Sequence, residues 1–301
     1  VSIRLISKAI ERKLFFNPGL HIGEAYMNKE LIVEKGTIED LINLVSNCYD
    51  DFISNNKFYK FYEFLSSVLM PLQQVNRLVN SKKNVAHHYD IDENLYKLFL
   101  DEDMQYSCAY FHNANISLEQ AQKDKKQHII NKLQINQNMN VLDIGCGWGG
   151  MAIEIAKSTG AKVKGITLSE NQFKTASERA HKEGLSDKVT FALQDYRNEN
   201  QLYDRIVSVG MFEHVGVKYF KTYLKKVNNI LKDNGVFLLH TIGQRGKPTA
   251  TSPWIRKYIF PGGYIPSLSE IMKETQKLNI NVTDIEVLRL HYAYTLSHWY
   301  K

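Results

Sequence analysis

The residues with the clearest chemical spacing in this chain lie between positions 141 and 150. The apolar run 141–144 contains Asp143 near its end, glycines follow at alternate positions, and a helical pattern begins at 149. A buried strand, a tight turn and a helix N-terminus are therefore expected in succession. Glycine is required where a backbone turns sharply and passes close to a ligand, and the Asp143 carboxylate can anchor the turn or the ligand. The pattern alone is also compatible with an ordinary strand-to-helix turn or a dinucleotide site.

The Asp-x-Gly-x-Gly-x-Gly form of this turn resembles the loop with which class I methyltransferases bind S-adenosylmethionine (SAM). In most such enzymes an acidic residue ending the second strand binds the ribose hydroxyls, but here that strand ends in GITLSE and the acid is missing. Thr167 or Gln172 can supply these hydrogen bonds instead, and Asp195, after the third strand, can accept from the adenine amine. Taken singly, Thr167 or Ser169 could equally cap the next helix, and Asp195 could be a solvated loop residue.

The fourth expected strand leads into a segment that gives a closer resemblance. Residues 208–216 read SVGMFEHVG, whereas many amine and amide methyltransferases carry an Asn/Asp-Pro-Pro-Tyr type motif there. This segment resembles the cyclopropane-fatty-acid synthases, which are relatives of the mycolic acid cyclopropane synthases. The resemblance extends in order over about residues 84–300, through HYD (88–90), MQYSCAY (104–110), QDYR (194–197), LHTIG (239–243) and WIRKYIFPGG (254–263). GEAYM at 23–27 is similar to the N-terminal domain of that family.

The resemblance implies an activity, a substrate and a set of site residues. The expected reaction transfers a methylene from SAM across the cis double bond of an unsaturated phospholipid acyl chain, and a bound bicarbonate ion takes the proton lost as the ring closes. By motif, the bicarbonate site would consist of Cys108, Glu213, His240, Tyr292 and the backbone at Ile242. A thiol, an imidazole, a phenol and a main-chain N–H can donate to an oxyanion, while Glu213 would accept the bicarbonate hydroxyl. The expected SAM-binding residues are Tyr106, Ser107, Asp143, Gly145, Gly147, Thr167, Leu168, Gln172, Gln194 and Asp195.

Several of these residues also have a simpler interpretation. Cys108 alone is most often a small buried hydrophobic residue, and His240 at a strand end is most often a core histidine. Tyr294 is a rival to Tyr292, although the spacing to the following Thr-Leu pair favours Tyr292. A carbocation in an apolar tunnel can be stabilised by aromatic faces, for which the candidates are Tyr106, Tyr110, Phe212, Tyr258 and Phe260. No metal site is expected, because the adjacent Glu-His pair at 213–214 diverges on a helix and no His/Cys pair has ligand spacing.

Composition and charge restrict the class of protein and its partners. The chain has 301 residues, 44% of them hydrophobic, and Lys+Arg 38 against Asp+Glu 32 gives a formal charge of +6. This small excess does not indicate nucleic acid but is compatible with an anionic membrane surface. Three cysteines, an odd and sparse number, suggest reduced thiols. Without a membrane-spanning stretch or a signal peptide, we expect a cytoplasmic protein, peripheral on the inner face of the cell membrane; a homodimer is left open.

The pattern of the whole chain predicts the elements that position these residues. Strand-like runs at 141–144, 162–167, 188–193, 203–209 and 235–242 alternate with helix-like runs at 149–158, 169–182 and 217–232. This alternation predicts an α/β fold with a parallel, doubly wound, Rossmann-like sheet. A helix at 268–278 and a late antiparallel strand at 280–290 are expected to follow. Near the N-terminus, 23–26 and 31–34 suggest a short strand pair, and Thr37 suggests a helix cap.

Two domains are expected from this organisation. Residues 1–80 would form a small, mostly helical N-terminal domain, and 81–301 the methyltransferase domain, with a linker at 81–84. The aromatic segment 57–79 is expected to be core packing or, alternatively, an amphipathic helix that contacts lipid. Relative to the family, the N-terminal domain looks incomplete and several C-terminal helices are expected to be missing.

Three other functions stay open at this point. The same lipid could be methylated to a methyl-branched or methylene product instead of being cyclopropanated. A small-molecule N-methyltransferase is compatible with the same fold. Finally, a shortened chain could bind SAM or membrane without turnover.

Overall fold

The structure is a computed structural model, and it describes residues 1–55, 93–246, 248–278 and 280–301. The chain divides into two units, one of residues 1–75 with 248–264 and the other of residues 76–247 with 265–301. The first unit therefore includes a late stretch of the chain, where we expected two consecutive domains. The expected boundary near residue 80 lies outside the described residues, as do the segments 57–79, 81–84 and 88–90.

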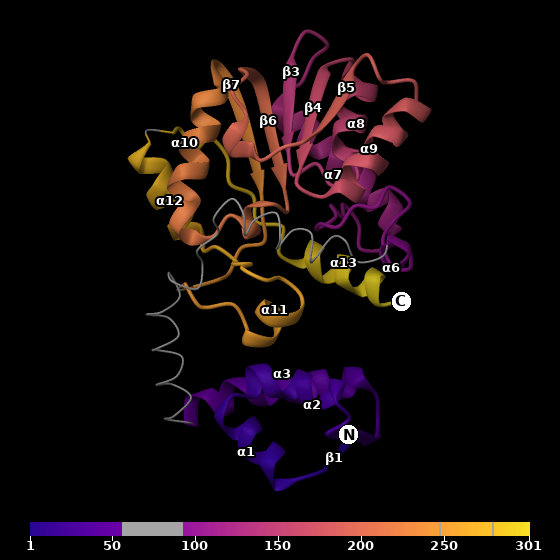
Figure 1. Ribbon diagram of the computed structural model, residues 1–301, viewed down its shortest axis with the longest axis vertical. Helices are drawn as coiled ribbons and strands as arrows, with labels where there is room; N and C mark the ends of the chain where they lie inside the picture. Colours follow the sequence, from indigo (N-terminus) through magenta and orange to yellow (C-terminus); the bar gives the residue numbers. More distant parts are fainter. Residues whose placement is uncertain (56–92, 247, 279) are drawn as a thin grey trace. The chain divides into compact units, whose positions relative to one another are not determined.

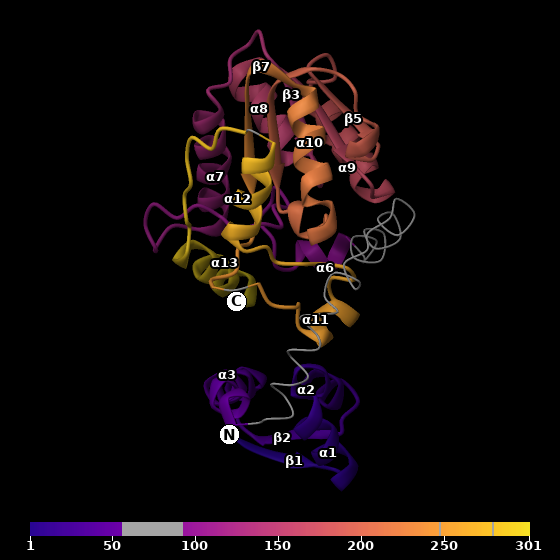
Figure 2. The same cartoon turned by 90° about the vertical axis from the view of Figure 1, so that its left-hand side faces the viewer.

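In its described residues, the second unit is built on a parallel five-stranded sheet with the order β5-β4-β3-β6-β7 (Figure 1). Its strands are β3 (Asn140–Ile144), β4 (Lys162–Thr167), β5 (Val189–Leu193), β6 (Tyr203–Val209) and β7 (Leu231–His240). The sheet is flanked by helices α7 (Leu118–Leu133), α8 (Gly150–Thr159), α9 (Glu170–Lys182) and α10 (Phe220–Ile230) (Figures 1 and 2). The predicted Rossmann-like α/β fold is confirmed. Because the strand order reverses between β3 and β6, their carboxyl ends form the switch point at which such sheets bind ligands.

The sheet forms because its central strands are aliphatic runs that helices cover. Val141 of β3 and Val207 of β6 are fully buried. They belong to one hydrophobic cluster with Leu133 of α7 and Ile155 of α8. Continuous apolar strands of this kind are typical of parallel sheets, which are buried on both faces. This packing fixes the strand ends from which the site residues project.

The late antiparallel strand expected at 280–290 is wrong. None of residues 280–289 is in a strand, and the helix α13 (Leu290–Tyr300) begins where the expected strand was to end. The alternation of apolar and polar residues imitates a strand, but Ile285 and Val287 are 50% and 77% exposed, so no sheet buries them. The segment is held instead by ion pairs of Glu286 with side chains of α7.

Shorter elements complete the described part of the second unit. They are α6 (Glu93–Lys97) and the 3₁₀ turns η1 (Tyr196–Asn198), η2 (Phe212–His214) and η3 (Val217–Tyr219). The helix expected at 268–278 is confirmed as α12 (Leu268–Lys277). Among the described residues of either unit, we find no helix with the length and apolar character needed to cross a membrane.

The first unit, in its described residues, combines a two-stranded antiparallel sheet with helices. β1 (Ser2–Leu5) pairs with β2 (Leu31–Lys35), and the helices are α1 (Lys8–Phe16), α2 (Pro18–Met27), α3 (Ile38–Asn55) and α11 (Pro253–Tyr258). β2 confirms the strand predicted at 31–34, and Thr37 accepts from the Asp40 N–H at 3.2 Å as the predicted cap. The strand predicted at 23–26 is wrong, because these residues belong to α2, where the lack of a Gly23 side chain admits the Trp254 ring.

Candidate active site

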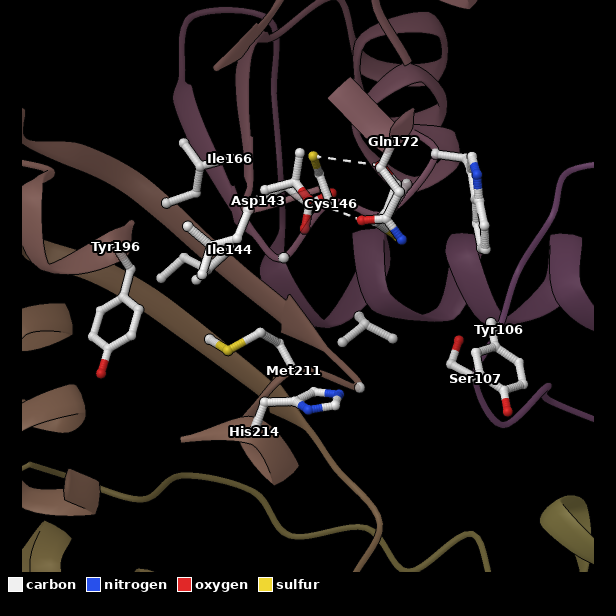
Figure 3. Close-up of a pocket in the computed structure, with 18 of the residues that line it drawn as sticks. Tyr106, Ser107, Asp143, Ile144, Cys146, Ile166, Gln172, Tyr196, Met211 and His214 are labelled. Atoms are coloured by element: carbon white, nitrogen blue, oxygen red, sulfur yellow. Dashed lines mark hydrogen bonds between the residues drawn. The ribbon is translucent and has the colours of Figure 1, made fainter. Parts of the chain in front are cut away.

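A pocket opens at the carboxyl ends of β3, β4, β5 and β6, at the switch point of the sheet (Figure 3). Together with the open space at its mouth, it measures about 1100 Å³. All ten residues expected to bind SAM line it, namely Tyr106, Ser107, Asp143, Gly145, Gly147, Thr167, Leu168, Gln172, Gln194 and Asp195. The fold thus brings four separate segments of the chain to one cavity.

The turn after β3 has a backbone that glycine adopts with little strain. Gly145, Gly147 and Gly149 have φ angles of +80°, +53° and +86°. A Cβ added at Gly145 would lie 2.7 Å from the Met211 side chain, and one at Gly149 would lie 2.7 Å from Phe191. A Cβ at Gly147 would meet no atom of the described residues within 4 Å. Since Gly147 lines the pocket, this open space is where a ligand can approach the backbone.

Asp143 carries a buried carboxylate near the end of β3. The residue is 1% exposed, and its Oδ2 has no hydrogen-bond partner in the described residues. Burial raises the pKa of Asp143 to about 7, while the positive charge of Lys125 acts in the opposite direction. A buried carboxyl without a partner is costly. Asp143 is therefore suited to a ligand that brings an N–H donor or a positive charge, as the amino-acid end of SAM does.

The residues after β4 combine a helix cap with a pocket wall. Ser169 caps α9 by accepting from the Gln172 N–H at 3.3 Å. The Thr167 hydroxyl donates to the Gln172 side-chain oxygen at 2.8 Å, and both side chains are almost fully buried. With no acidic residue at this strand end, the Thr167–Gln172 pair supplies the polar atoms that a ribose would meet.

Gln194 and Asp195 follow β5, and each is held by neighbouring polar side chains. Arg197 donates to the two carboxylate oxygens of Asp195 at 2.8 and 2.9 Å. The Gln194 amide donates to buried Glu199 at 3.0 Å, and Glu199 pairs with Lys164 at 2.5 Å. A carboxylate oxygen can accept more than one hydrogen bond. Asp195 is therefore fixed in place and still able to accept from an adenine amine.

Buried polar residues of α7, which the sequence did not lead us to expect at the site, fasten the loop 104–107 that lines the pocket. Gln122 donates to the carbonyl oxygens of Gln105 and Ser107 at 3.2 and 3.0 Å. Lys125 donates to the Gln105 side-chain oxygen and to the Ser107 hydroxyl, both at 2.7 Å. A separation of three residues places Gln122 and Lys125 on one face of the helix. This spacing of two polar residues along one helix face is the feature of the sequence that could have indicated their role.

The five expected catalytic residues come from separate elements and are not part of this pocket wall. Glu213 of η2 accepts from the Ile242 N–H at 2.6 Å, which links the segments after β6 and β7. The second oxygen of Glu213 and Nδ1 of His240 are buried and have no partner in the described residues. Buried polar atoms of this kind usually bind a ligand or an ordered water. The two strand ends therefore form a second polar site, outside the wall of the pocket.

Burial keeps the thiol, phenol and imidazole of this group neutral at pH 7. It raises the pKa of Cys108 to about 11 and that of Tyr292 to about 12. It lowers the pKa of His240 to about 4 and raises the pKa of Glu213 above its usual value. Cys108 and Tyr292 are therefore donors that keep their protons, and the imidazole of His240 is a weak base.

Tyr292 and Tyr294 of helix α13 lie in different surroundings. Burial raises the pKa of Tyr292, and Tyr106, Cys108 and Glu213 act in the same direction. Tyr294 instead packs edge-on against Phe111, with ring centroids 5.6 Å apart. The choice of Tyr292 over Tyr294 as a site residue stays a prediction.

The aromatic candidates for cation stabilisation lie in different surroundings. Tyr106 lines the pocket. Phe212 is fully buried in stacked contact with another phenylalanine, and Tyr110 stacks on a histidine of α7. Tyr258 and Phe260 belong to the first unit. In the part of the chain that the structure describes, no group of three or more His, Cys, Asp or Glu residues could hold a metal ion.

The parallel sheet, its glycine turn and the pocket at its switch point define the Rossmann-like fold of class I SAM-dependent methyltransferases. Residues 76–301 match the profile of the family described as mycolic acid cyclopropane synthetase. This match covers well over half of the chain, and the chain belongs to that family.

Similar proteins agree with this assignment. The chain is 47% identical over 214 residues to the cyclopropane-fatty-acyl-phospholipid synthase of Escherichia coli K12, a match that covers 71% of this chain and 54% of the relative. It is 43% identical over 222 residues to a probable fatty acid methyltransferase of Pseudomonas putida, covering 71% and 56%. Among solved structures, the chain is similar to mycolic acid cyclopropane synthase CmaA1 complexed with SAH and CTAB, with 33% sequence identity and a TM-score of 0.68. This match covers 72% of this chain and 81% of that one. The chain spans about half the length of the curated relatives it matches.

Proposed function

We propose that this chain carries the catalytic part of a SAM-dependent cyclopropane synthase that acts on unsaturated acyl chains of phospholipids. The observation that carries the proposal is the pairing of two sites in one unit. One is a pocket with the residues for SAM, and the other is a buried polar group around Glu213 and Ile242. The E. coli relative, a cyclopropane-fatty-acyl-phospholipid synthase, supports the choice of substrate.

The pocket residues suit the parts of SAM, which supplies an electrophilic methyl group. Asp143 would bind the ammonium of the amino-acid end, and the open backbone at Gly147 would face the same end. Thr167 and Gln172 would bind the ribose, and Asp195 would accept from the adenine amine. The SAH bound in the related CmaA1 structure supports the same ligand class.

The chemistry of an alkene explains why the second site lacks a strong base. A double bond has no proton to lose before it attacks the methyl group, so no residue has to activate it. After the first C–C bond has formed and the bond from carbon to sulfur has broken, one proton must leave the new methyl carbon as the ring closes. Cys108 and Tyr292 hold their own protons, and His240, with a pKa of about 4, is a weak acceptor. A bicarbonate ion would supply the missing base.

Glu213 would orient that ion. One of its oxygens is occupied by the Ile242 N–H, and the other is free among the described residues to accept the bicarbonate hydroxyl. Cys108 and Tyr292 would donate to the remaining oxygens. Tyr106, on the pocket wall, would face the cationic substrate with its ring. Exclusion of water protects the cation from capture as an alcohol.

We extend the proposal to the membrane. A substrate within a bilayer requires the protein to contact a lipid surface, and the net charge of +6 favours an anionic one. We propose a peripheral position on the cytoplasmic face of the cell membrane. Assembly into a homodimer stays a prediction that a mass measurement in solution would decide.

The test is to incubate purified protein with SAM and vesicles of an unsaturated phospholipid, and to weigh the product lipids. We expect acyl chains heavier by one CH2 that survive ozonolysis, because a cyclopropane has no double bond to cleave. A methylene product would be cleaved and would favour the alternative of a lipid methyltransferase, which the Pseudomonas putida relative makes reasonable. The absence of any SAM-dependent change in the lipid would refute the proposal.

A further inference from the structure

Lys125 is a buried cation beside the pocket whose closest partners are all neutral. The residue is 2% exposed, and its Nζ donates at 2.7 Å to the side chains of Gln105 and Ser107, an amide and a hydroxyl. Among the described residues it takes part in no ion pair, unlike its neighbour Lys126, which pairs with Asp103 at 2.6 Å. A buried charge without a counter-charge in contact is costly. This cost would fall if a ligand supplied the anion.

The nearby carboxylates already have other partners. Asp103 binds both Lys126 and Arg179. Asp101 accepts from the backbone N–H groups of Gln105 at 2.8 Å and of Asp103 at 3.3 Å. Neither carboxylate comes within ion-pair distance of Lys125. Burial lowers the pKa of Lys125 to about 8, and the charges of Asp101 and Asp103 only partly oppose this shift. An ammonium has three N–H donors, and the described residues use two of those of Lys125.

The position of Lys125 relates it to both sites. Ser107, which it binds, lines the pocket, and Cys108 follows directly in the chain. Lys125 therefore contacts a residue of the pocket wall and is hydrogen-bonded to the residue next to Cys108 of the second site.

We propose that Lys125 binds an oxyanion of the reaction complex through its third N–H and its charge. Two ligands carry such an oxyanion: the carboxylate end of SAM and the bicarbonate ion. The inference rests on the proposed function for the identity of these ligands, and binding measurements that need no turnover test it. Lys125 is in either case a binding residue that the family motifs in the sequence did not indicate.

Three variants isolate the charge. Lys125→Met removes the ammonium and keeps the length of the side chain. Lys125→Gln removes the charge but keeps a donor for the loop, and it carries the test if the methionine variant does not fold. Lys123→Met, on the exposed side of the same helix, loses one charge away from the site and is the matched control.

Calorimetry with two probes separates the sources of the oxyanion. SAH has the carboxylate, and 5′-methylthioadenosine lacks the amino-acid end. If Lys125 binds the carboxylate, the Lys125 variants lose about ten- to hundredfold in SAH affinity, the range for hydrogen bonds to charged groups. Their affinity for methylthioadenosine then stays unchanged, which also shows that the pocket is intact.

The bicarbonate arm uses ¹³C-labelled bicarbonate and NMR. If Lys125 binds this ion, the parent and the Lys123→Met control broaden its resonance, the Lys125 variants do not, and SAH affinity is the same in all. The inference is overturned if both ligands bind the variants as they bind the parent, or if methylthioadenosine affinity falls as far as that of SAH. Failure of the parent to bind either ligand would overturn the inference together with the proposed function. If the parent binds the ligands and the Lys125 variants bind them equally well, the inference is overturned while the proposed function stands.

Discussion

Replacement of Glu213 by glutamine tests the chemistry of the second site with little change in shape. The amide oxygen of the new side chain would be a neutral acceptor for the Ile242 N–H, which Glu213 now binds at 2.6 Å. The substitution replaces the second oxygen, which is buried without a partner in the described residues, by an NH2 group. An NH2 group there donates where the oxygen accepted, so it cannot orient a bicarbonate hydroxyl. Glu213→Ala would be a poorer test, because it also leaves the Ile242 N–H unsatisfied, at a cost of about 1–3 kcal/mol.

The expected magnitude follows from the role assigned to the residue. Glu213 would position the bicarbonate that acts as the base, and a positioned general base contributes about 10²–10⁴-fold in rate. This range corresponds to roughly 2.7–5.4 kcal/mol of barrier at about 1.36 kcal/mol per tenfold. Stability should change by less than about 1.5 kcal/mol, since one hydrogen bond is weakened while a buried charge is removed. SAH affinity should stay near that of the parent, because Glu213 does not line the pocket.

The assay compares initial rates of lipid conversion by mass spectrometry, in buffer depleted of carbonate and after bicarbonate is added. Glu178→Gln, at an exposed position of α9, is the control for loss of one carboxylate. Added bicarbonate should raise the rate of the parent and have little effect on Glu213→Gln. Full cyclopropanation by the variant, together with a parent that ignores depletion, would refute this role. Loss of activity without bicarbonate dependence would keep Glu213 catalytic and reassign the proton to a protein base, with His240 examined first.

Three further outcomes are expected. Gly147→Val should fold and lose more than about tenfold in SAH affinity by calorimetry, because its side chain would enter the open space of the pocket. Gly149→Ala should instead lower the melting temperature, since its Cβ would lie 2.7 Å from Phe191. Retained SAH affinity in Gly147→Val would contradict the assignment of the turn. The folded-state pKa of Asp143 is raised to about 7, so its contribution to stability is present below the unfolded value near 4 and is lost as pH rises through about 7. Asp143→Asn should therefore raise the melting temperature at about pH 8 more than at about pH 5, and an equal effect at both would contradict the shift. The protein should bind reversibly to anionic vesicles, and this binding should weaken with added salt, because charges are screened over about 10 Å at 0.1 M. Vesicle sedimentation across a salt series measures it. Binding that depends neither on salt nor on lipid charge would refute the electrostatic contribution and leave apolar insertion as the explanation.

The sequence predicted the sheet and the pocket because their signals are local. Each strand of the sheet is a short aliphatic run, and Val141 and Val207 are buried as such runs require. The site residues stand at the ends of these runs or directly after them. Since the carboxyl ends of parallel strands meet at one edge, order along the chain was enough to bring Asp143, Thr167 and Asp195 together.

The errors arose where tertiary contacts override local pattern. Residues 280–290 alternate like a strand, but ion pairs to α7 hold them outside any sheet. Residues 23–26 suggested a strand, yet they belong to a helix, and the Trp254 ring, from far along the chain, lies where a side chain at Gly23 would be. Helix α7 was missed altogether, since Gln122 and Lys125 on its buried face remove the apolar stripe that would reveal it.

The catalytic candidates illustrate a second limit. Cys108 and Tyr292 are far apart in the chain, and no periodicity relates them. Their proximity depends on α13 lying against the segment after Cys108, where Thr295 accepts from the Ala109 N–H at 3.0 Å. Only a family resemblance in long motifs could associate them beforehand.

Among the described residues, the site contains both negatively and positively charged side chains that lack a full set of partners. Asp143 and Glu213 each have an unpartnered oxygen, and Lys125 lacks an ion pair. A hydrocarbon double bond needs none of these groups, since it offers neither charge nor hydrogen bonds. A zwitterionic amino-acid end with a sulfonium, together with a small oxyanion, would need groups of both signs. The polar half of the site is therefore best explained by the co-substrate and the base. On this reasoning the lipid must be selected by apolar contacts, and exchange of its head group should change the rate less than loss of its double bond.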